Sequence, residues 1–67
     1  MIQIFVNGQS LETIPNTSIR DLLRHLKIDQ LGTAVALNQS VVPKSQWGEI
    51  ELKEQDNLVT FHAVAGG

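Results

Sequence analysis

Residues 18–27 read Ser-Ile-Arg-Asp-Leu-Leu-Arg-His-Leu-Lys, and this stretch decides the fold of the chain. Ser18 is a good N-cap, and Asp21, three residues later, resembles the second half of a capping box. Apolar residues then recur at i, i+3, i+4 and i+7, namely Ile19, Leu22, Leu23 and Leu26. This spacing predicts a helix of about three turns with one buried stripe, ending within residues 29–32. No other segment has convincing helical periodicity.

A β-hairpin is predicted before this helix. Residues 2–6 alternate apolar side chains with a period of two, which indicates a strand with one buried face. Asn7-Gly8 follows at once and favours a type I′ turn, because both residues tolerate positive φ. The returning strand, residues 9–14, has apolar side chains on opposite faces, so a bulge or an early end near Thr13 is expected.

Short apolar runs separated by turns follow the helix. Residues 34–37 are unbroken and apolar, as in a strand buried on both faces, and a turn follows. Residues 41–43 predict a short edge strand, because Pro43 cannot donate to a ladder. Trp47 lies in the next turn and is expected to pack inside, since a small core needs its large side chains.

The last predicted strand, residues 58–64, has two unequal faces. The more apolar face is assigned to the core and consists of Val59, Phe61 and Ala63. The other face is expected to be partly exposed and consists of Leu58, Thr60, His62 and Val64.

The order strand, strand, helix, strand, short strand, strand predicts an α+β fold. Only the connection through the helix is long enough to cross over between parallel strands. A mixed four- to five-stranded sheet wrapped around one main helix is the β-grasp, or ubiquitin-like, arrangement. A ferredoxin-like fold fits less well because it needs a second helix. We expect one ubiquitin-like domain at residues 1–64 and a flexible tail at residues 65–67.

Composition narrows the function. The chain has 67 residues, no cysteine and a formal net charge of −2. A domain this small buries only about 60% of its unfolded surface, so a carrier or binding module is favoured over an enzyme with a large cavity. The scattered Lys and Arg residues argue against nucleic acid. Without an apolar run of about 20 residues or a signal-peptide pattern, a cytoplasmic protein without membrane contact is expected.

The sequence closes on Ala65-Gly66-Gly67 directly after an apolar run. Glycine lacks a Cβ atom, so two terminal glycines can enter a slot too narrow for other residues. This favours a function in which the carboxylate of Gly67 is the reacting group. The plainer alternative is that the chain merely ends on small residues.

Several stretches carry a resemblance to a known family. They are Gln3-Ile4-Phe5-Val6-Asn7-Gly8, Thr17-Ser18-Ile19-Arg20-Asp21-Leu22-Leu23, Val35-Ala36-Leu37-Asn38, Val41-Val42-Pro43-Lys44-Ser45-Gln46-Trp47, and Asp56-Asn57-Leu58-Val59-Thr60-Phe61 with Ala65-Gly66-Gly67. Over nearly its whole length the chain resembles the ThiS family of bacterial sulfur carriers in thiamine biosynthesis, within the ubiquitin-like ThiS/MoaD group. MoaD proteins, the small subunits of molybdopterin synthase, carry prolines just before the same tail. Residues 61–64 contain none, which favours ThiS.

The resemblance implies a carrier that is a substrate of partner enzymes. A ThiF-type enzyme would use MgATP to adenylate the carboxylate of Gly67, and sulfur from a persulfide donor would replace AMP. The resulting thiocarboxylate would deliver sulfur to the thiazole synthase ThiG. Gly66 would give access to the partner's active site, with Ala65 in the flexible lead. The carrier itself is expected to bind no cofactor, because its glycines form no phosphate loop.

Docking on these partners is expected on the sheet face that points away from the helix. The residues predicted for this surface are Phe5, Leu58, His62 and Val64. An exposed apolar cluster marks an interaction site, although Phe5 fits a corner of a small core equally well. The two histidines lack ligand spacing and cysteine neighbours, so no metal site is expected.

Three other functions stay open. One is a MoaD-like sulfur carrier for molybdopterin synthesis. Another is a ubiquitin-like modifier whose Gly67 forms an isopeptide bond with a lysine of a partner. The third is an interaction domain whose tail does no chemistry.

Overall fold

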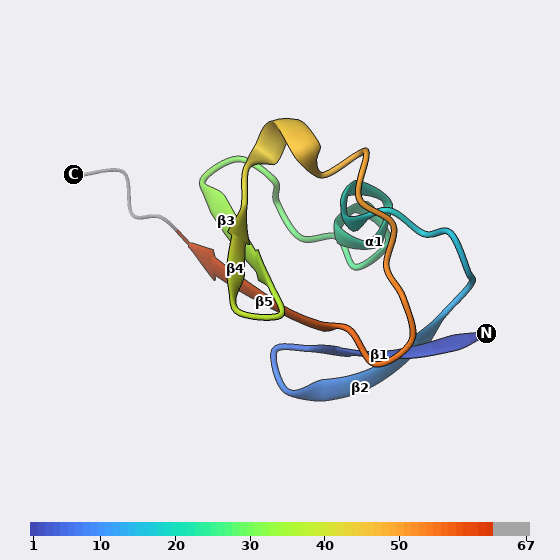
Figure 1. Cartoon of the computed structure of the whole chain (residues 1–67). Helices are drawn as coiled ribbons and strands as arrows, with labels where there is room; N and C mark the ends of the chain where they lie inside the picture. Colours follow the sequence, from blue (N-terminus) through green and yellow to red (C-terminus); the bar gives the residue numbers. More distant parts are fainter. Residues whose placement is uncertain (63–67) are drawn as a thin grey trace.

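The computed structural model describes residues 1–62, and the predicted boundary between a domain at residues 1–64 and a tail at residues 65–67 lies outside them. Within residues 1–62 the elements are β1 (Ile2–Val6), β2 (Gln9–Thr13), α1 (Ile19–His25), β3 (Thr33–Leu37), β4 (Ser40–Val42), the 3₁₀ helix η1 (Lys44–Gln46) and β5 (Asn57–His62). The five strands described form one mixed sheet in the order β2-β1-β5-β3-β4 (Figure 1). α1 lies against one face of this sheet, so the predicted β-grasp arrangement is confirmed. At seven residues, α1 is too short to span a membrane, and no other helix within residues 1–62 could do so.

Both tight turns form where they are predicted, and the Asn7-Gly8 turn has the predicted conformation. β1 and β2 are antiparallel and joined by Asn7 and Gly8, whose φ angles are 52° and 85°. The turn between β3 and β4 places Asn38 and Gln39 at φ 51° and 73°. Positive φ at both central residues gives a turn whose twist matches that of the paired strands. β2 ends before Ile14, which is 63% exposed, so an early strand end resolves the conflict between its two faces.

α1 begins as predicted but ends earlier. The Ser18 hydroxyl oxygen accepts a hydrogen bond from the backbone N–H of Asp21 at 3.1 Å, which caps one of the unpaired N–H groups of the first turn. At the other end Lys27 takes a left-handed conformation with φ 60°. The N–H of Ile28 then reaches back to the carbonyl of Leu23 at 2.9 Å, as in a Schellman cap. The expected third turn is therefore absent from α1.

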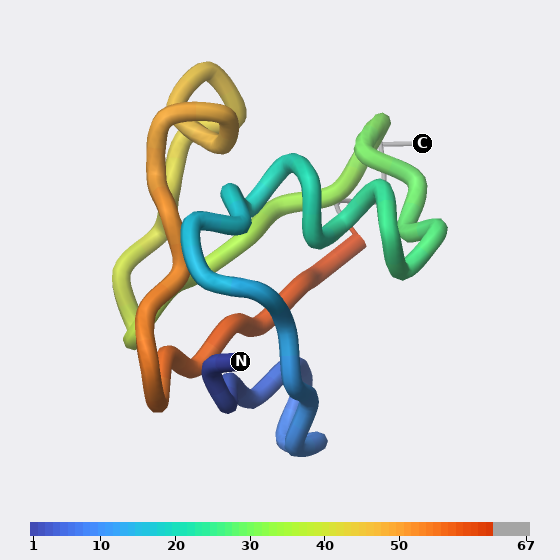
Figure 2. The backbone as a smooth tube through the Cα atoms, turned by 90° about the vertical axis from the view of Figure 1, so that its right-hand side faces the viewer, coloured from blue at the N-terminus to red at the C-terminus, as the bar shows by residue number. Residues whose placement is uncertain are grey.

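The segment that follows η1 runs beside the N-terminal end of α1 (Figure 2). The N–H of Arg20 donates to the carbonyl of Trp47, and the N–H of Ile19 donates to that of Ile50, each at 3.1 Å. The first N–H groups of a helix have no acceptor within the helix, and these two hydrogen bonds supply acceptors for the N–H groups of Ile19 and Arg20. They also tie the irregular chain between β4 and β5 to the helix.

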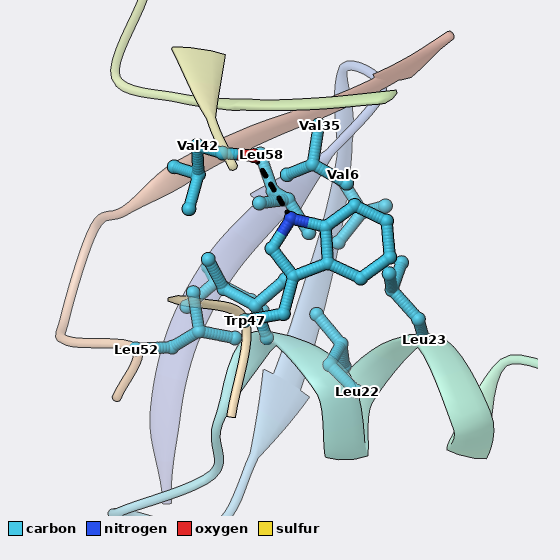
Figure 3. Close-up of a cluster of buried hydrophobic side chains, with 10 residues drawn as sticks. Val6, Leu22, Leu23, Val35, Val42, Trp47, Leu52 and Leu58 are labelled. Carbon is cyan, nitrogen blue, oxygen red and sulfur yellow. Dashed lines mark hydrogen bonds between the residues drawn. The ribbon is translucent and has the colours of Figure 1, made fainter. Parts of the chain in front are cut away.

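The core lies between the sheet and α1. Its buried apolar residues are Ile4, Val6, Ile19, Leu22, Leu23, Val35, Val42, Trp47, Leu52 and Leu58. The Trp47 ring points into this cluster between α1 and the sheet (Figure 3) and is 1% exposed. Its Nε1–H donates to the carbonyl of Val42 at 3.0 Å, which pairs the polar atom of the ring. The predicted packing role of Trp47 is confirmed.

The predicted facing of β5 is wrong. Leu58 is fully buried, whereas Phe61 is 47% exposed and Val59 is only half-buried. The cause is the register, which pairs Leu58 with the core residue Val6 of β1. Directly paired residues share a face, and successive residues alternate faces, so Leu58 points to α1 and Phe61 points away. Ala63, also assigned to the core, lies outside the described residues.

Candidate functional site

β5 is the strand that leads towards Gly67, and it lies in the middle of the sheet. It is parallel to β1, with Val6 opposite Leu58, and antiparallel to β3, with Thr33 opposite His62. β1 pairs with the first two residues of β5, whereas β3 pairs with residues 58–62, so β3 alone is paired with the last two residues of the strand. The end of β5 is therefore a defined point on the body of the domain from which the remaining residues continue.

The sheet face that points away from α1 carries a group of apolar side chains, which we call the outer patch. Its members, from β1, β3, β4 and β5, are Phe5, Ala34, Ala36, Val41, Val59 and Phe61. The register pairs Phe61 with Ala34, and it pairs Ala36 with both Val59 and Val41, so these side chains are neighbours. Val41 is 72% exposed and Phe61 is 47% exposed. Of the other members, Ala36 is buried and the remaining three are half-buried. Because exposed apolar clusters are typical of contact sites, the outer patch is a candidate surface for docking.

The residues predicted for docking divide between the two faces. Phe5 belongs to the outer patch and is half-buried there. Leu58 does not, because it is fully buried in the core. His62 is exposed, but the alternation along β5 puts it on the same face as Leu58 and not on the face predicted for it. Val64 and the residues predicted to act in the tail, Ala65, Gly66 and Gly67, lie outside the described residues.

Sequence reasoning missed Val59, Phe61 and Val41 as surface residues. The last strand has apolar side chains on both faces, and its sequence pattern favours the richer face as the core face. A central strand over a single helix needs only one fully buried face, and the other stays open. The signal that favours Leu58 as the core residue is its pairing with Val6, and that pairing is not local in the sequence.

Two open grooves lie away from the outer patch. The larger, of about 380 Å³, lies between the end of β2 and α1 and is lined by Ile14, Glu12, Asp21 and His25 among others. The second, of about 250 Å³, lies between the first hairpin and the end of α1 and includes Leu11 and Leu26. Within residues 1–62, no group of three or more His, Cys, Asp or Glu side chains is arranged to hold a metal ion.

Comparison with known proteins gives one consistent family. The ThiS family model matches residues 4–67. A protein of Escherichia coli (strain K12) named Sulfur carrier protein ThiS is 33% identical over 66 residues, which cover 98% of this chain and 100% of that protein. The chain matches the crystal structure of a thiamine biosynthesis protein (ThiS) from Geobacter metallireducens with a TM-score of 0.87 and 23% identity, covering 98% of this chain and 100% of that one. This last likeness concerns the fold.

A longer relative adds a different observation. A protein of Paramagnetospirillum magneticum (strain ATCC 700264 / AMB-1) named Thiazole synthase is 26% identical over 66 residues. The match covers 98% of this chain but 20% of that protein. The chain therefore spans about a fifth of this relative, which contains a segment similar to the whole small domain.

Proposed function

The chain belongs to the ThiS family and is a sulfur carrier of thiamine biosynthesis, and on this premise we propose that the carboxylate of Gly67 is the group that carries the sulfur. The observation that supports this most is the extent of the family match, which runs from residue 4 through Gly67. The tail predicted to act is thus inside the shared region. Gly66 then serves as a spacer without a side chain, and Ala65 connects it to the body.

The chemistry needs activation, because a carboxylate repels nucleophiles. A free α-carboxyl group has a pKa of about 3.3–3.7, so Gly67 is ionised and attacks the α-phosphate of MgATP held by a ThiF-type partner. Pyrophosphate leaves and an acyl adenylate forms. The terminal sulfur of a persulfide donor then attacks the acyl carbon and releases AMP. A second thiol cleaves the S–S bond, which leaves a thiocarboxylate on Gly67 and a disulfide on the donor side.

In this scheme the carrier contributes a tail that can enter the partner's active site and a surface that the partner binds, which we call the grip. The partner contributes positioning and electrostatics. We assign the grip to the outer patch. It is apolar and partly exposed, and it includes Phe61 and Val59, which lie on the strand that leads to Gly67. A partner that covers this face therefore holds the same strand that delivers the carboxylate.

The acceptor of the sulfur is proposed to be a thiazole synthase of the ThiG type. The support is the relative named Thiazole synthase, part of which resembles this chain over 66 residues. Joining the two units in one polypeptide raises their effective concentration for each other.

Intact mass after reaction with the partner enzyme tests the proposal. The chain is incubated with a ThiF-type enzyme, MgATP, a persulfide donor and a thiol. The expected product has one oxygen exchanged for sulfur at the C-terminus, and a chain that lacks Gly67 should gain nothing. An active partner that leaves the full chain unchanged would contradict the assignment of Gly67.

A matched pair of variants tests the grip. Phe61→Asp places a charge on the outer patch and should raise the KM of the carrier for the ThiF-type enzyme at least about tenfold, as for a desolvated apolar contact. Leu31→Asp is the control, because Leu31 is 77% exposed but lies in the connection between α1 and β3. Equal effects of the two substitutions would contradict the assignment of the outer patch.

A further inference from the structure

The turn residue Asn7 holds β5 with its side chain as well as with its backbone. Its N–H donates to the carbonyl of Leu58 at 2.8 Å. Its Oδ1 accepts from the N–H of Thr60 at 2.9 Å, and its Nδ2 donates to the Thr60 hydroxyl oxygen at 3.1 Å. One residue at the tip of a hairpin thus makes three hydrogen bonds to a strand 53 positions away in sequence.

The reason for a carboxamide at this position is the way β1 ends. The pairing of β1 with β5 includes Phe5 with Asn57 and Val6 with Leu58, and then β1 turns away through Asn7 and Gly8. The next N–H of β5 that points to this side belongs to Thr60. The Asn7 carboxamide stands in for the missing strand backbone, with an acceptor for this N–H and a donor for the hydroxyl group. Asn is also one of the few side chains that tolerates the left-handed conformation found here.

The second hairpin carries a counterpart of Asn7. Asn38 also opens a type I′ turn, at φ 51°. Its Oδ1 accepts from the N–H of Asn57 at 2.9 Å, and its own N–H donates to the carbonyl of Asn57 at 2.8 Å. Both asparagines therefore hold β5 by the same chemistry. Asn38 acts at the first residue of β5, whereas Asn7 acts at Thr60, seven positions before Gly67.

We propose that Asn7 is a positioning residue for the activation of Gly67. Among residues 1–62, Thr60 is the furthest point along β5 that is held from the β1 side, while β3 holds the other side as far as His62. Asn7 thereby fixes the line along which β5 leaves the body of the domain. This inference rests on the proposed function, because it concerns delivery of the Gly67 carboxylate. A misplacement of about 1 Å at a reacting group lowers rates by about a hundredfold.

Steady-state kinetics with the ThiF-type enzyme tests this, with pyrophosphate release as the readout. Asn7→Gly keeps the left-handed turn but removes both side-chain hydrogen bonds. It should lower kcat at least about tenfold and change KM less than about threefold, because the outer patch is intact. Asn38→Gly removes the matching contact at the start of β5 and should leave kcat within about twofold of the original. Asn7→Asp keeps an acceptor for the Thr60 N–H and should restore most of kcat.

Amide hydrogen exchange gives a readout that does not depend on activity. Asn7→Gly should speed exchange at Thr60 much more than at Val59, whereas Asn38→Gly should act at Asn57. Equal kcat for the two glycine variants and the original chain would overturn the positioning role, as would an equal loss in both. An Asp variant as slow as Asn7→Gly would overturn the assignment to Oδ1. If the original chain itself releases no pyrophosphate, the proposed function fails, and the exchange pattern still decides whether Asn7 holds β5.

Discussion

Replacing Leu58 by alanine should lower the free energy of unfolding far more than replacing Phe61 by alanine, although both residues lie on β5. Leu58 is fully buried and Phe61 is 47% exposed. The Leu58 side chain lies beside Val6 and Leu37, its partners in β1 and β3, in the same buried cluster as Trp47 (Figure 3). Two hydrogen-bonded strands and an indole ring cannot move in to refill the space. The resulting cavity therefore stays largely open.

The size of the effect follows from this burial. A buried Leu→Ala substitution costs about 2–5 kcal/mol, more where the site cannot collapse, so we expect Leu58→Ala to cost at least about 3 kcal/mol. At about 0.05–0.15 kcal/mol per residue, the whole 67-residue chain has a free energy of unfolding of about 3–10 kcal/mol. The Phe61 side chain is already about half exposed to water, so Phe61→Ala should lower the free energy of unfolding by only about 1 kcal/mol. The gap between the two variants should therefore exceed about 2 kcal/mol.

Urea unfolding measures both variants against the original chain. Trp47 is the single tryptophan and is 1% exposed, so its fluorescence reports the core directly, with far-UV circular dichroism as the second probe. The melting temperature of Leu58→Ala should fall by about 12 °C or more, at about 4–8 °C per kcal/mol for a domain of this size. A cost below about 1 kcal/mol for Leu58→Ala, or equal costs for the two variants, would refute the facing of β5.

Three further predictions concern local structure. Lys27→Gly should raise the free energy of unfolding by about 0.5–1 kcal/mol, because φ is 60° at Lys27 and glycine adopts this conformation without strain. Arg24→Gly, inside α1, should lower it by about 1 kcal/mol. Chemical denaturation measures both variants, and changes of the same sign would contradict the Schellman cap. Ser18→Ala should lower the free energy of unfolding by about 1 kcal/mol through loss of the N-cap, and Ser45→Ala, at an exposed position in η1, should leave it within about 0.5 kcal/mol. Trp47→Phe removes the hydrogen bond from Nε1 to the Val42 carbonyl and part of a fully buried ring, and should lower the free energy of unfolding by at least about 1 kcal/mol in thermal unfolding.

Features set by neighbouring residues could be predicted from the sequence. Asn7-Gly8 gives its turn because two adjacent residues both tolerate positive φ, and Ser18 gives the helix start because its partner Asp21 is three residues away. The early end of α1 was not predicted, because Lys27 carries no side-chain preference for the left-handed conformation. Packing of the half-buried Ile28 against the core accompanies that conformation, and such packing depends on residues far away in sequence.

The missed parts of the candidate site are all non-local. The facing of β5 depends on which residue stands opposite Val6, and periodicity within β5 cannot decide this because both of its faces are apolar. The hydrogen bonds between Asn7 and Thr60 join residues 53 positions apart. The turn between β1 and β2 is already a sufficient reason for an asparagine at position 7. When a local role accounts for a residue type, the sequence does not indicate that the side chain also makes a long-range contact.

The arrangement around β5 sets a geometric limit on any partner that uses it as proposed. Phe61 lies six positions before Gly67, and a fully extended chain spans at most about 3.3–3.6 Å per residue. The carboxylate proposed to react therefore lies at most about 22 Å from the place where a partner contacts the outer patch at Phe61. A partner with a more distant reacting centre has to hold the domain elsewhere. Asn7 and β3 hold β5 from its two sides. A partner that binds the outer patch therefore also orients β5 relative to its own reacting centre, and it has to position only the residues after His62.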